Sequence, residues 1–241
     1  MFGVRESIEP WARQVVRSYM PQEHREFHTA LPFLVAAARD QLGRPWATIL
    51  TGAEGFVSSP DSRHLEIAAS PTTGDALENQ LAAGTDVGLL GIGLGNRRRN
   101  RLNGRVGSRR AEGFSFAVDQ SFGNCPQYIR ERQWTRRTHE PSPAVRESRL
   151  TSQMQHWCER ADTLFIASGH RSDAGSRTFG MDASHRGGPP GFVQVQGSQT
   201  LLIPDYAGNN HYNTIGNLVM DPRMGLVFVD FESGGMLQLT G

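Results

Sequence analysis

Short apolar runs separated by glycine, asparagine and proline dominate this chain. Runs rich in β-branched and aromatic residues are typical of buried strands, whereas apolar residues at helical spacing indicate an amphipathic helix. By this criterion residues 1–43 form a helical N-terminal segment, which includes the run 33–38. Further helices are predicted at 74–83, 121–134, 150–160 and 215–219, and strands at 46–50, 55–57, 65–69, 87–94, 114–118, 162–168, 201–203 and 225–231.

The second part of the chain repeats the pattern of the first. Residues 88–104 align with residues 225–241 without a gap, and each stretch begins with a strand that starts at glycine. The predicted strand at 162–168 matches residues 46–52 in the same comparison. A self-match of this kind indicates duplicated units.

Each unit contains three strands, a short helix and at least two more strands, which is not the regular alternation of a doubly wound sheet. The sequence therefore predicts an α+β fold of two tandem antiparallel barrels, each crossed by a helix. Because the chain stops inside the second copy, we expect either that its last strands are missing or that the natural protein is longer. The predicted organisation is an N-terminal segment at 1–43, a first unit at 44–135, a proline-containing linker at 136–149 and a second unit at 150–241.

The composition, 37% apolar and 20% charged, is that of a globular protein, and a net charge of +1 gives no overall field that attracts nucleic acid or a membrane. All 25 basic residues are arginine, which excludes a lysine Schiff base or a lysine general base. Cys125 and Cys158 provide neither a disulfide framework nor metal-ligand spacing. Since no apolar run has the length of a signal peptide or a membrane span, we expect a cytoplasmic protein without a metal, nucleic-acid or membrane partner.

An asparagine-rich turn at 208–210 precedes the predicted helix at 215–219. Glycine and asparagine tolerate positive φ, so the turn would present backbone N–H groups and side-chain amides at the positive end of the helix dipole. This arrangement suits a phosphate group. A capped helix between two strands explains the same residues without any ligand.

Arginine is densest between Arg97 and Arg110. In a strand, Arg97, Arg99 and Arg101 would share one face, because side chains alternate between the two faces. The cluster is either a phosphate or nucleotide clamp or a solvated edge hairpin that resists pairing. Nucleic-acid binding would need a wider basic surface with interleaved aromatic residues.

Residues 182–191 gather aspartate, serine, histidine and arginine in a glycine-rich stretch, which we expect to be a loop before a strand. Adjacent loop residues rarely meet the geometry of a hydrolytic triad, but a glycine-rich backbone lets a flat ligand approach closely. The glycines at 91–95 lack the spacing of a dinucleotide-binding fingerprint. Cys125 is either a thiol activated near a helix start or a buried, inert one.

Taken together, several of these motifs resemble the pyridoxamine 5′-phosphate oxidase-like FMN-binding proteins, the split β-barrel flavoproteins, and most of all their duplicated bacterial branch. The resemblance covers about residues 40–135 and 150–241. The motifs that carry it lie at 97–104 and 121–129 in the first unit, and at 182–187, 190–193, 203–210, 217–218 and 221–231 in the second.

The resemblance implies a split barrel that forms a homodimer and binds FMN at the subunit interface. In the family pattern the phosphate lies near the helix start, which would give that role to four residues of this chain: Asn209, Asn210, Asn213 and Thr214. The same pattern would place three residues near the isoalloxazine ring or the phosphate, namely Ser184, Arg186 and Gly187.

One departure from the family concerns the phosphate charge. The oxidases of the family place a lysine close to the position of Thr214, and this chain contains none. The charge would then be met by arginine, for which Arg186, Arg99 and Arg105 are the candidates. The C-terminal signature with which the oxidases bind vitamin B6 is also absent.

By resemblance, the chain is an FMN-dependent oxidoreductase whose partner would be NAD(P)H or another small redox molecule. The alternative is a non-catalytic module that holds a flavin or another phosphorylated ligand as a carrier, a sensor or an electron relay. A structural dimer without any ligand is a third hypothesis. An enzyme should bleach when it is mixed with its reductant and reoxidise in air, whereas a carrier should not.

Overall fold

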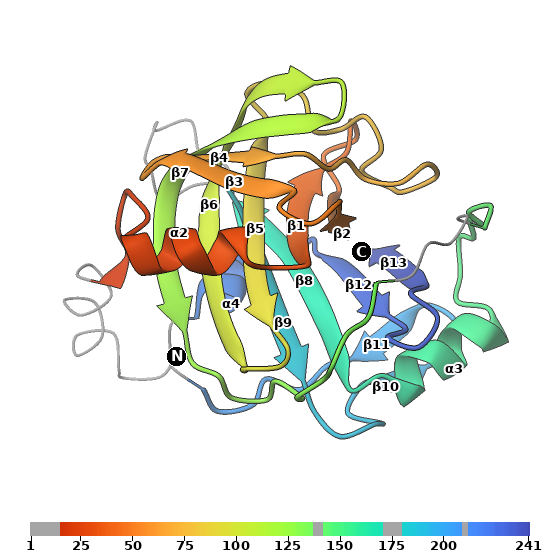
Figure 1. Cartoon of the computed structure of the whole chain (residues 1–241). Coiled ribbons are helices and arrows are strands. Elements are labelled where there is room, and N and C mark those ends of the chain that lie inside the picture. The colour runs from red at the N-terminus through yellow and green to blue at the C-terminus, as the bar shows by residue number, and fades with distance from the viewer. Residues whose placement is uncertain (1–14, 137–141, 171–179, 209–211) are drawn as a thin grey trace.

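The computed structural model describes residues 15–136, 142–170, 180–208 and 212–241 (Figure 1). Antiparallel sheets make up most of this part of the chain, and the helices are short. The predicted α+β class is confirmed, with the strands arranged in open sheets. No helix within the described ranges is both long and apolar enough to cross a membrane.

In the described residues, the first half of the chain forms helix α2 and a large antiparallel sheet. Its elements are α2 (Gln22–Thr29), β1 (Phe33–Arg39), β2 (Pro45–Thr51), β3 (Val57–Asp61), β4 (His64–Ile67), β5 (Asp86–Gly93), β6 (Arg98–Arg110) and β7 (Gly113–Asn124). The strand order is β2-β1-β5-β6-β7-β4-β3. A cluster of buried aliphatic and phenylalanine side chains from all of these strands fills the interior of this half.

The second half forms a smaller sheet with two helices. Its elements are α3 (Ser152–Arg160), β8 (Thr163–His170), β9 (Gly180–Gly187), β10 (Gln194–Gln196), β11 (Thr200–Leu202), α4 (Asn213–Met220), β12 (Gly225–Val229) and β13 (Met236–Thr240). The main sheet has the order β13-β12-β8-β9, and β10 and β11 form a separate hairpin. The Thr151 hydroxyl caps α3 by accepting the backbone N–H of Met154.

The two halves pack against each other through small apolar side chains of β1, β2 and β5 on one side and of β8, β9 and β12 on the other. Figure 1 shows β8 and β9 passing behind β5. A Cβ atom at Gly88 would lie 2.6 Å from Asp182 Cα, and one at Gly225 would lie 2.5 Å from Trp46 Cα. The sheets therefore meet backbone to backbone at these glycines, which brings β6 of the first half close to β9 of the second.

Most of the predicted elements are confirmed. The apolar runs coincide, within a few residues, with strands β2, β4, β5, β7, β8, β11 and β12, and a strand begins as predicted at Val57. The helices predicted at 150–160 and 215–219 are α3 and α4. The second of them ends before Pro222, because the residue that precedes proline avoids the α region and Asp221 is extended.

Three helix predictions are wrong. The run 33–38 is strand β1, buried on both faces, and a continuous apolar run of this kind has no alternation by which sequence could tell it from a helix. Residues 74–83 form turns, in which the Asp75 carboxylate accepts the N–H of Leu77. Residues 121–124 extend β7, and the chain beyond them is irregular. Of the predicted N-terminal helical segment, residues 22–29 form α2, residues 16–20 are not helical, and residues 1–14 lie outside the described part.

Both halves use the same order of pairing. Strand β1 pairs with β2 and β5, and β5 pairs with β6. In the same way β8 pairs with β9 and β12, and β12 pairs with β13. The strand that corresponds to β8 is therefore β1, which corrects the sequence match of 162–168 with 46–52.

A buried histidine in α2 makes the stability of the fold depend on pH. The His28 side chain is fully buried, and its Nδ1 lies 2.8 Å from the His24 carbonyl oxygen. Burial is the main cause that lowers the pKa of His28 from 6.5 to about 4. The folded state thus binds fewer protons than the unfolded state between these values, so stability is present above pH 6.5 and is lost as the pH falls toward 4.

The wild type should lose unfolding free energy between pH 7 and pH 4.5. We expect this loss to be about 2 kcal/mol smaller in His28→Gln. Urea unfolding at a series of pH values measures this. The exposed histidine of α3 gives the control, and His156→Gln should leave the slope as it is in the wild type. Equal slopes for His28→Gln and the wild type would show that His28 does not carry the effect.

Candidate functional site

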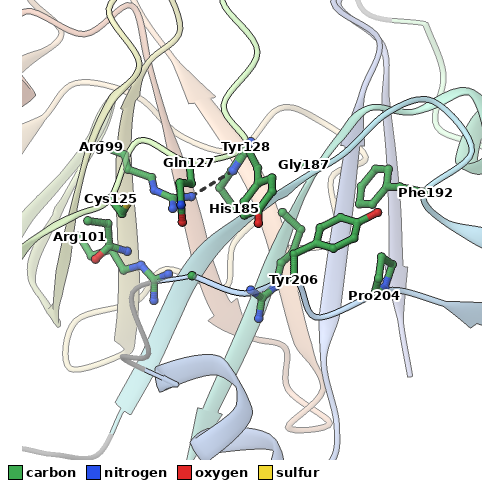
Figure 2. Close-up of a pocket in the computed structure, with 13 residues that line it drawn as sticks. Arg99, Arg101, Cys125, Gln127, Tyr128, His185, Gly187, Phe192, Pro204 and Tyr206 are labelled. Carbon is green, nitrogen blue, oxygen red and sulfur yellow. Dashed lines mark hydrogen bonds between the residues drawn. The ribbon is translucent and has the colours of Figure 1, made fainter. Parts of the chain in front are cut away.

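A cleft lies where the two halves meet (Figure 2). One wall comes from β6 and the segment 124–128 that follows β7, and the other comes from β9 and the segment 204–208 that follows β11. The residues predicted to form a loop at 182–191 are largely strand β9, so that prediction is wrong for 182–187. The lining residues are Arg99, Arg101, Asn124, Cys125, Gln127, Tyr128, His185, Arg186, Gly187, Phe192, Pro204, Tyr206 and Gly208.

Arg101 joins the two walls at the buried base of the cleft. Its Nη1 donates to Asp182 Oδ2 at 2.9 Å, and its Nη2 donates to Ser184 Oγ at 2.7 Å. With its amide oxygen turned toward the guanidinium, Asn124 accepts from Arg101 Nε at 2.7 Å. Burial raises the pKa of Asp182, and the charge of Arg101 opposes this rise. The Arg101 guanidinium thus binds groups of the protein itself, and its main role is to hold the two halves together.

Arg99 lies beside Arg101 on the same face of β6 and contacts a buried histidine. Its Nη1 is 3.1 Å from His185 Nδ1. Because a guanidinium only donates, Nδ1 must accept, and the ring carries its proton on Nε2. Burial, followed by the charge of Arg99, holds the pKa of His185 well below its ordinary value, so the ring is neutral at pH 7.

Two buried N–H donors of this pair have no acceptor in the described part of the chain. The Nε of Arg99 and the Nε2 of His185 lack a hydrogen-bond partner among the described residues. Burial, and then the neighbouring Arg101, lower the pKa of Arg99 to about 10, so the guanidinium stays charged near neutral pH. A buried donor without an acceptor costs free energy, and a bound acceptor or anion would recover that cost.

The mouth of the cleft combines a third arginine with two aromatic rings. Arg186 Nη2 pairs with Asp205 Oδ1 at 3.1 Å, and burial is the main cause that lowers the pKa of Arg186. The rings of Tyr128 and Tyr206 stack with centroids 5.3 Å apart, and the Tyr128 hydroxyl donates to the Ala207 carbonyl at 2.8 Å. Figure 2 shows the two tyrosines side by side at the opening.

The structure brings together only part of the predicted site. Arg99, Arg186 and Gly187 line the cleft, and Ser184 lies at its base in contact with Arg101. Arg105 lies elsewhere on β6, where its exposed side chain pairs with Asp86 at 3.1 Å. Of the residues predicted to surround the phosphate, Asn213 and buried Thr214 begin α4, which packs on β8 and β9, while Asn209 and Asn210 lie outside the described residues.

The sequence predicted that Arg99 and Arg101 share one strand face, and both line the cleft. Sequence reasoning missed three other contributors. No pattern marked the role of His185, because the strand that buries it was predicted to be a loop. Tyr128 and Tyr206 are far apart in sequence and meet only through the packing of the two halves.

Gly187 sets the distance between the walls. A Cβ atom at this position would lie 2.1 Å from the Tyr128 carbonyl oxygen, closer than any real contact. Tyr128 itself has a φ of 64°, so the segment 124–128 is held in one unusual conformation against β9. The glycine is thus required by the close approach of two backbones.

Gly187→Ala is expected to push the segment 124–128 away from β9 and to destabilise the protein by about 1–3 kcal/mol. The tyrosine stack would open with it, which near-ultraviolet circular dichroism detects. Gly216→Ala in α4 is the matched control: its Cβ meets no atom within 4 Å, and it should be neutral or stabilising. If Gly187→Ala and Gly216→Ala changed the stability equally, the close approach of Gly187 to the Tyr128 carbonyl would be contradicted.

No protein-family model matches the chain, and no curated protein sequence matches it either. The site is therefore interpreted from its own geometry. Among the described residues, no three histidine, cysteine, aspartate or glutamate side chains gather in a way that could hold a metal ion.

Proposed function

We propose that the chain is an FMN-binding flavoprotein of the oxidoreductase class, built from two tandem split-barrel units with the flavin in the cleft between them. The observation that carries this proposal is the excess of buried positive charge at the cleft. Arg99, Arg101 and Arg186 converge there, while Asp182 and Asp205 supply the only carboxylates in contact with them among the described residues. A ligand with a phosphate group would balance that charge.

The residues present fit FMN on two observations. The unpartnered donors of Arg99 and His185 call for a ligand acceptor, which a phosphate or a ring carbonyl provides. The stacked tyrosines at the mouth offer a flat apolar surface for an aromatic ring. In this proposal Arg99, Arg186 and the start of α4 at Asn213 and Thr214 hold the phosphate, and the tyrosines border the ring.

FMN would supply the redox chemistry when bound, and the protein supplies binding and orientation. At the cleft, neutral His185 can donate one hydrogen bond through Nε2. Arg101 keeps the walls at a fixed distance through its contacts across the two halves. Dimerisation of the whole chain stays a prediction.

Anaerobic mixing of the FMN-loaded protein with NADH or NADPH separates an enzyme from a carrier. An oxidoreductase that uses these donors bleaches at 450 nm, a wavelength at about which any oxidised flavin absorbs, and regains colour in air. A protein that keeps its colour with both donors, but is bleached by dithionite as the positive control, takes no electrons from nicotinamide donors, as expected of a carrier or relay.

Thr214→Ala is expected to weaken FMN by about tenfold and riboflavin by less than about twofold, since one hydrogen bond to a charged group is worth about 1.5 kcal/mol and only FMN carries the phosphate. Fluorescence titration of both flavins measures the difference. Thr214→Ser keeps the hydroxyl and should bind both as the wild type does. Equal losses of FMN and riboflavin affinity in Thr214→Ala would show that the start of α4 does not bind the phosphate.

A further inference from the structure

The two halves repeat one register of strand pairing. In the β5–β6 pair Gly88 lies opposite Asn103, and in the β12–β13 pair Gly225 lies opposite Thr240, so both partners are shifted by 137 residues. Because the shift is the same on both strands, each residue of β12 and β13 has its equivalent 137 residues earlier, in β5 or β6. Two further sets of equivalent pairs are Ala37–Ala47 with Ala167–Ala183, and Ser58–Glu66 with Gln194–Leu202.

The contacts between the halves are reciprocal. Gly88 of the first half approaches Asp182 on β9, and its equivalent Gly225 approaches Trp46, which is the equivalent of Asp182 on β2. Each half therefore offers the other the same surface, as in a symmetric dimer. One chain thus contains two equivalent positions, of which the cleft is one.

At both positions a polar side chain crosses to the opposite half. Arg101 reaches Ser184 on β9 with Nη2 at 2.7 Å. Its equivalent 137 residues later is Gln238, whose Nε2 donates to the Ala47 carbonyl on β2 at 2.8 Å and to Asp75 Oδ2 at 3.2 Å. A neutral amide thus stands where the cleft has a cation, and it meets the Asp75 carboxylate.

The Asp75 carboxylate fills the second position. It is almost fully buried, with 5% of the residue exposed. The Thr48 hydroxyl and the Gln238 amide donate to Oδ2, and the Leu77 backbone N–H donates to Oδ1 at 2.7 Å. A hydroxyl, a backbone N–H and a donor from the other half thus converge on one internal anion.

Three polar residues of the cleft have apolar equivalents at the second position. Thr48 is the equivalent of Ser184, and Ile49, Leu50 and Met236 are the equivalents of His185, Arg186 and Arg99.

From this comparison we infer that the second position is a ligand site closed by the carboxylate of Asp75, so that each chain binds one ligand, in the cleft formed by its own two halves. The inference rests on the proposed function for the identity of the ligand, FMN. The closure itself rests on the Asp75 contacts. A single chain therefore binds the flavin without a partner subunit.

Native mass spectrometry and calorimetric titration of the full chain with FMN test the stoichiometry. One FMN per chain is expected, at an affinity that does not change when the protein is diluted. Gln238→Ala should keep the ratio at one and the dissociation constant within about twofold of the wild type. Two FMN per chain, or one per two chains, would overturn the inference.

A second measurement tests the closure without FMN. Asp75→Ala should lower the Tm by about 5 °C, because three buried donors lose their acceptor. Acetate, which stands in for the missing carboxylate, should restore part of this loss and leave the wild type unchanged. The double variant Asp75→Ala with Thr48→Val should gain less from acetate.

The two measurements fail in different ways. A chain that binds no FMN but shows acetate rescue loses the proposed function and keeps the closed position. A variant Asp75→Ala that is as stable as the wild type, or that acetate does not affect, contradicts the closure whatever the chain binds.

Discussion

Arg101→Gln is expected to destabilise the protein by about 3–5 kcal/mol and to abolish binding in the cleft. The guanidinium is buried and donates to Asp182 and Ser184 across the two halves. Its removal leaves a buried carboxylate without a counterion, and breaking one partner of a buried ion pair costs about this much. Glutamine is also the residue found at the equivalent position, Gln238, so the side chain is compatible with the strand.

Urea unfolding at pH 7 measures the loss, and Asp182→Asn supplies the control. The double variant Arg101→Gln with Asp182→Asn should recover a large part of the stability, because no unpaired charge remains. Lowering the pH should also reduce the cost of Arg101→Gln, since a carboxyl whose pKa burial already raises takes a proton once its cation is gone. If the two single costs simply add in the double variant, the ion pair does not hold the halves together.

The double variant Arg99→Gln with Arg186→Gln is expected to weaken FMN by about 10²–10⁴-fold while riboflavin loses less than about tenfold. Each charge-assisted hydrogen bond to a phosphate is worth about 1.5–3 kcal/mol, and riboflavin has no phosphate. The protein should stay folded, because neither arginine has a buried carboxylate partner: Arg99 contacts neutral His185, and Arg186 pairs with exposed Asp205.

Titration with both flavins at one ionic strength makes the comparison, and Arg105→Gln is the matched control. The substitution Arg105→Gln removes a positive charge from the same strand, β6. The Arg105 side chain lies outside the cleft, where it pairs with Asp86. It should change FMN affinity by less than about twofold. A comparable loss in Arg105→Gln would mean that general charge, and not the cleft, attracts the ligand.

Strands with turn residues at their ends could be predicted from the sequence, because glycine, asparagine and proline mark where each apolar run stops. Strands β5 and β12 are examples. The run of alanines in β1 could not, since small residues suit a helix, and the strand is selected by its pairing with β2 and β5 and by its burial on both faces. The prediction of a loop at 182–187 was wrong for a related reason: the polar side chains there are buried against partners from β6.

The site was predictable in its chemistry and not in its assembly. Arginine clustering indicated an anion, and the glycine-rich stretch at 182–191 indicated the close approach of a flat ligand; Arg99 and Gly187 line the cleft. What sequence could not supply is which arginines meet, because Arg99 and Arg186 become neighbours only through the contact between the halves. The match of residues 88–104 with 225–241 already pairs Arg101 with Gln238, but only the structure shows that both side chains reach the opposite half.

The most direct test of the account is the visible absorbance spectrum of the freshly purified full chain after incubation with FMN and removal of the excess. The account predicts a flavin spectrum that stays with the protein, and a chromophore released by heat that migrates as FMN. A chain that remains colourless, and that quenches no FMN fluorescence in titration, would contradict it and leave the arginine cleft as a site for a different anion.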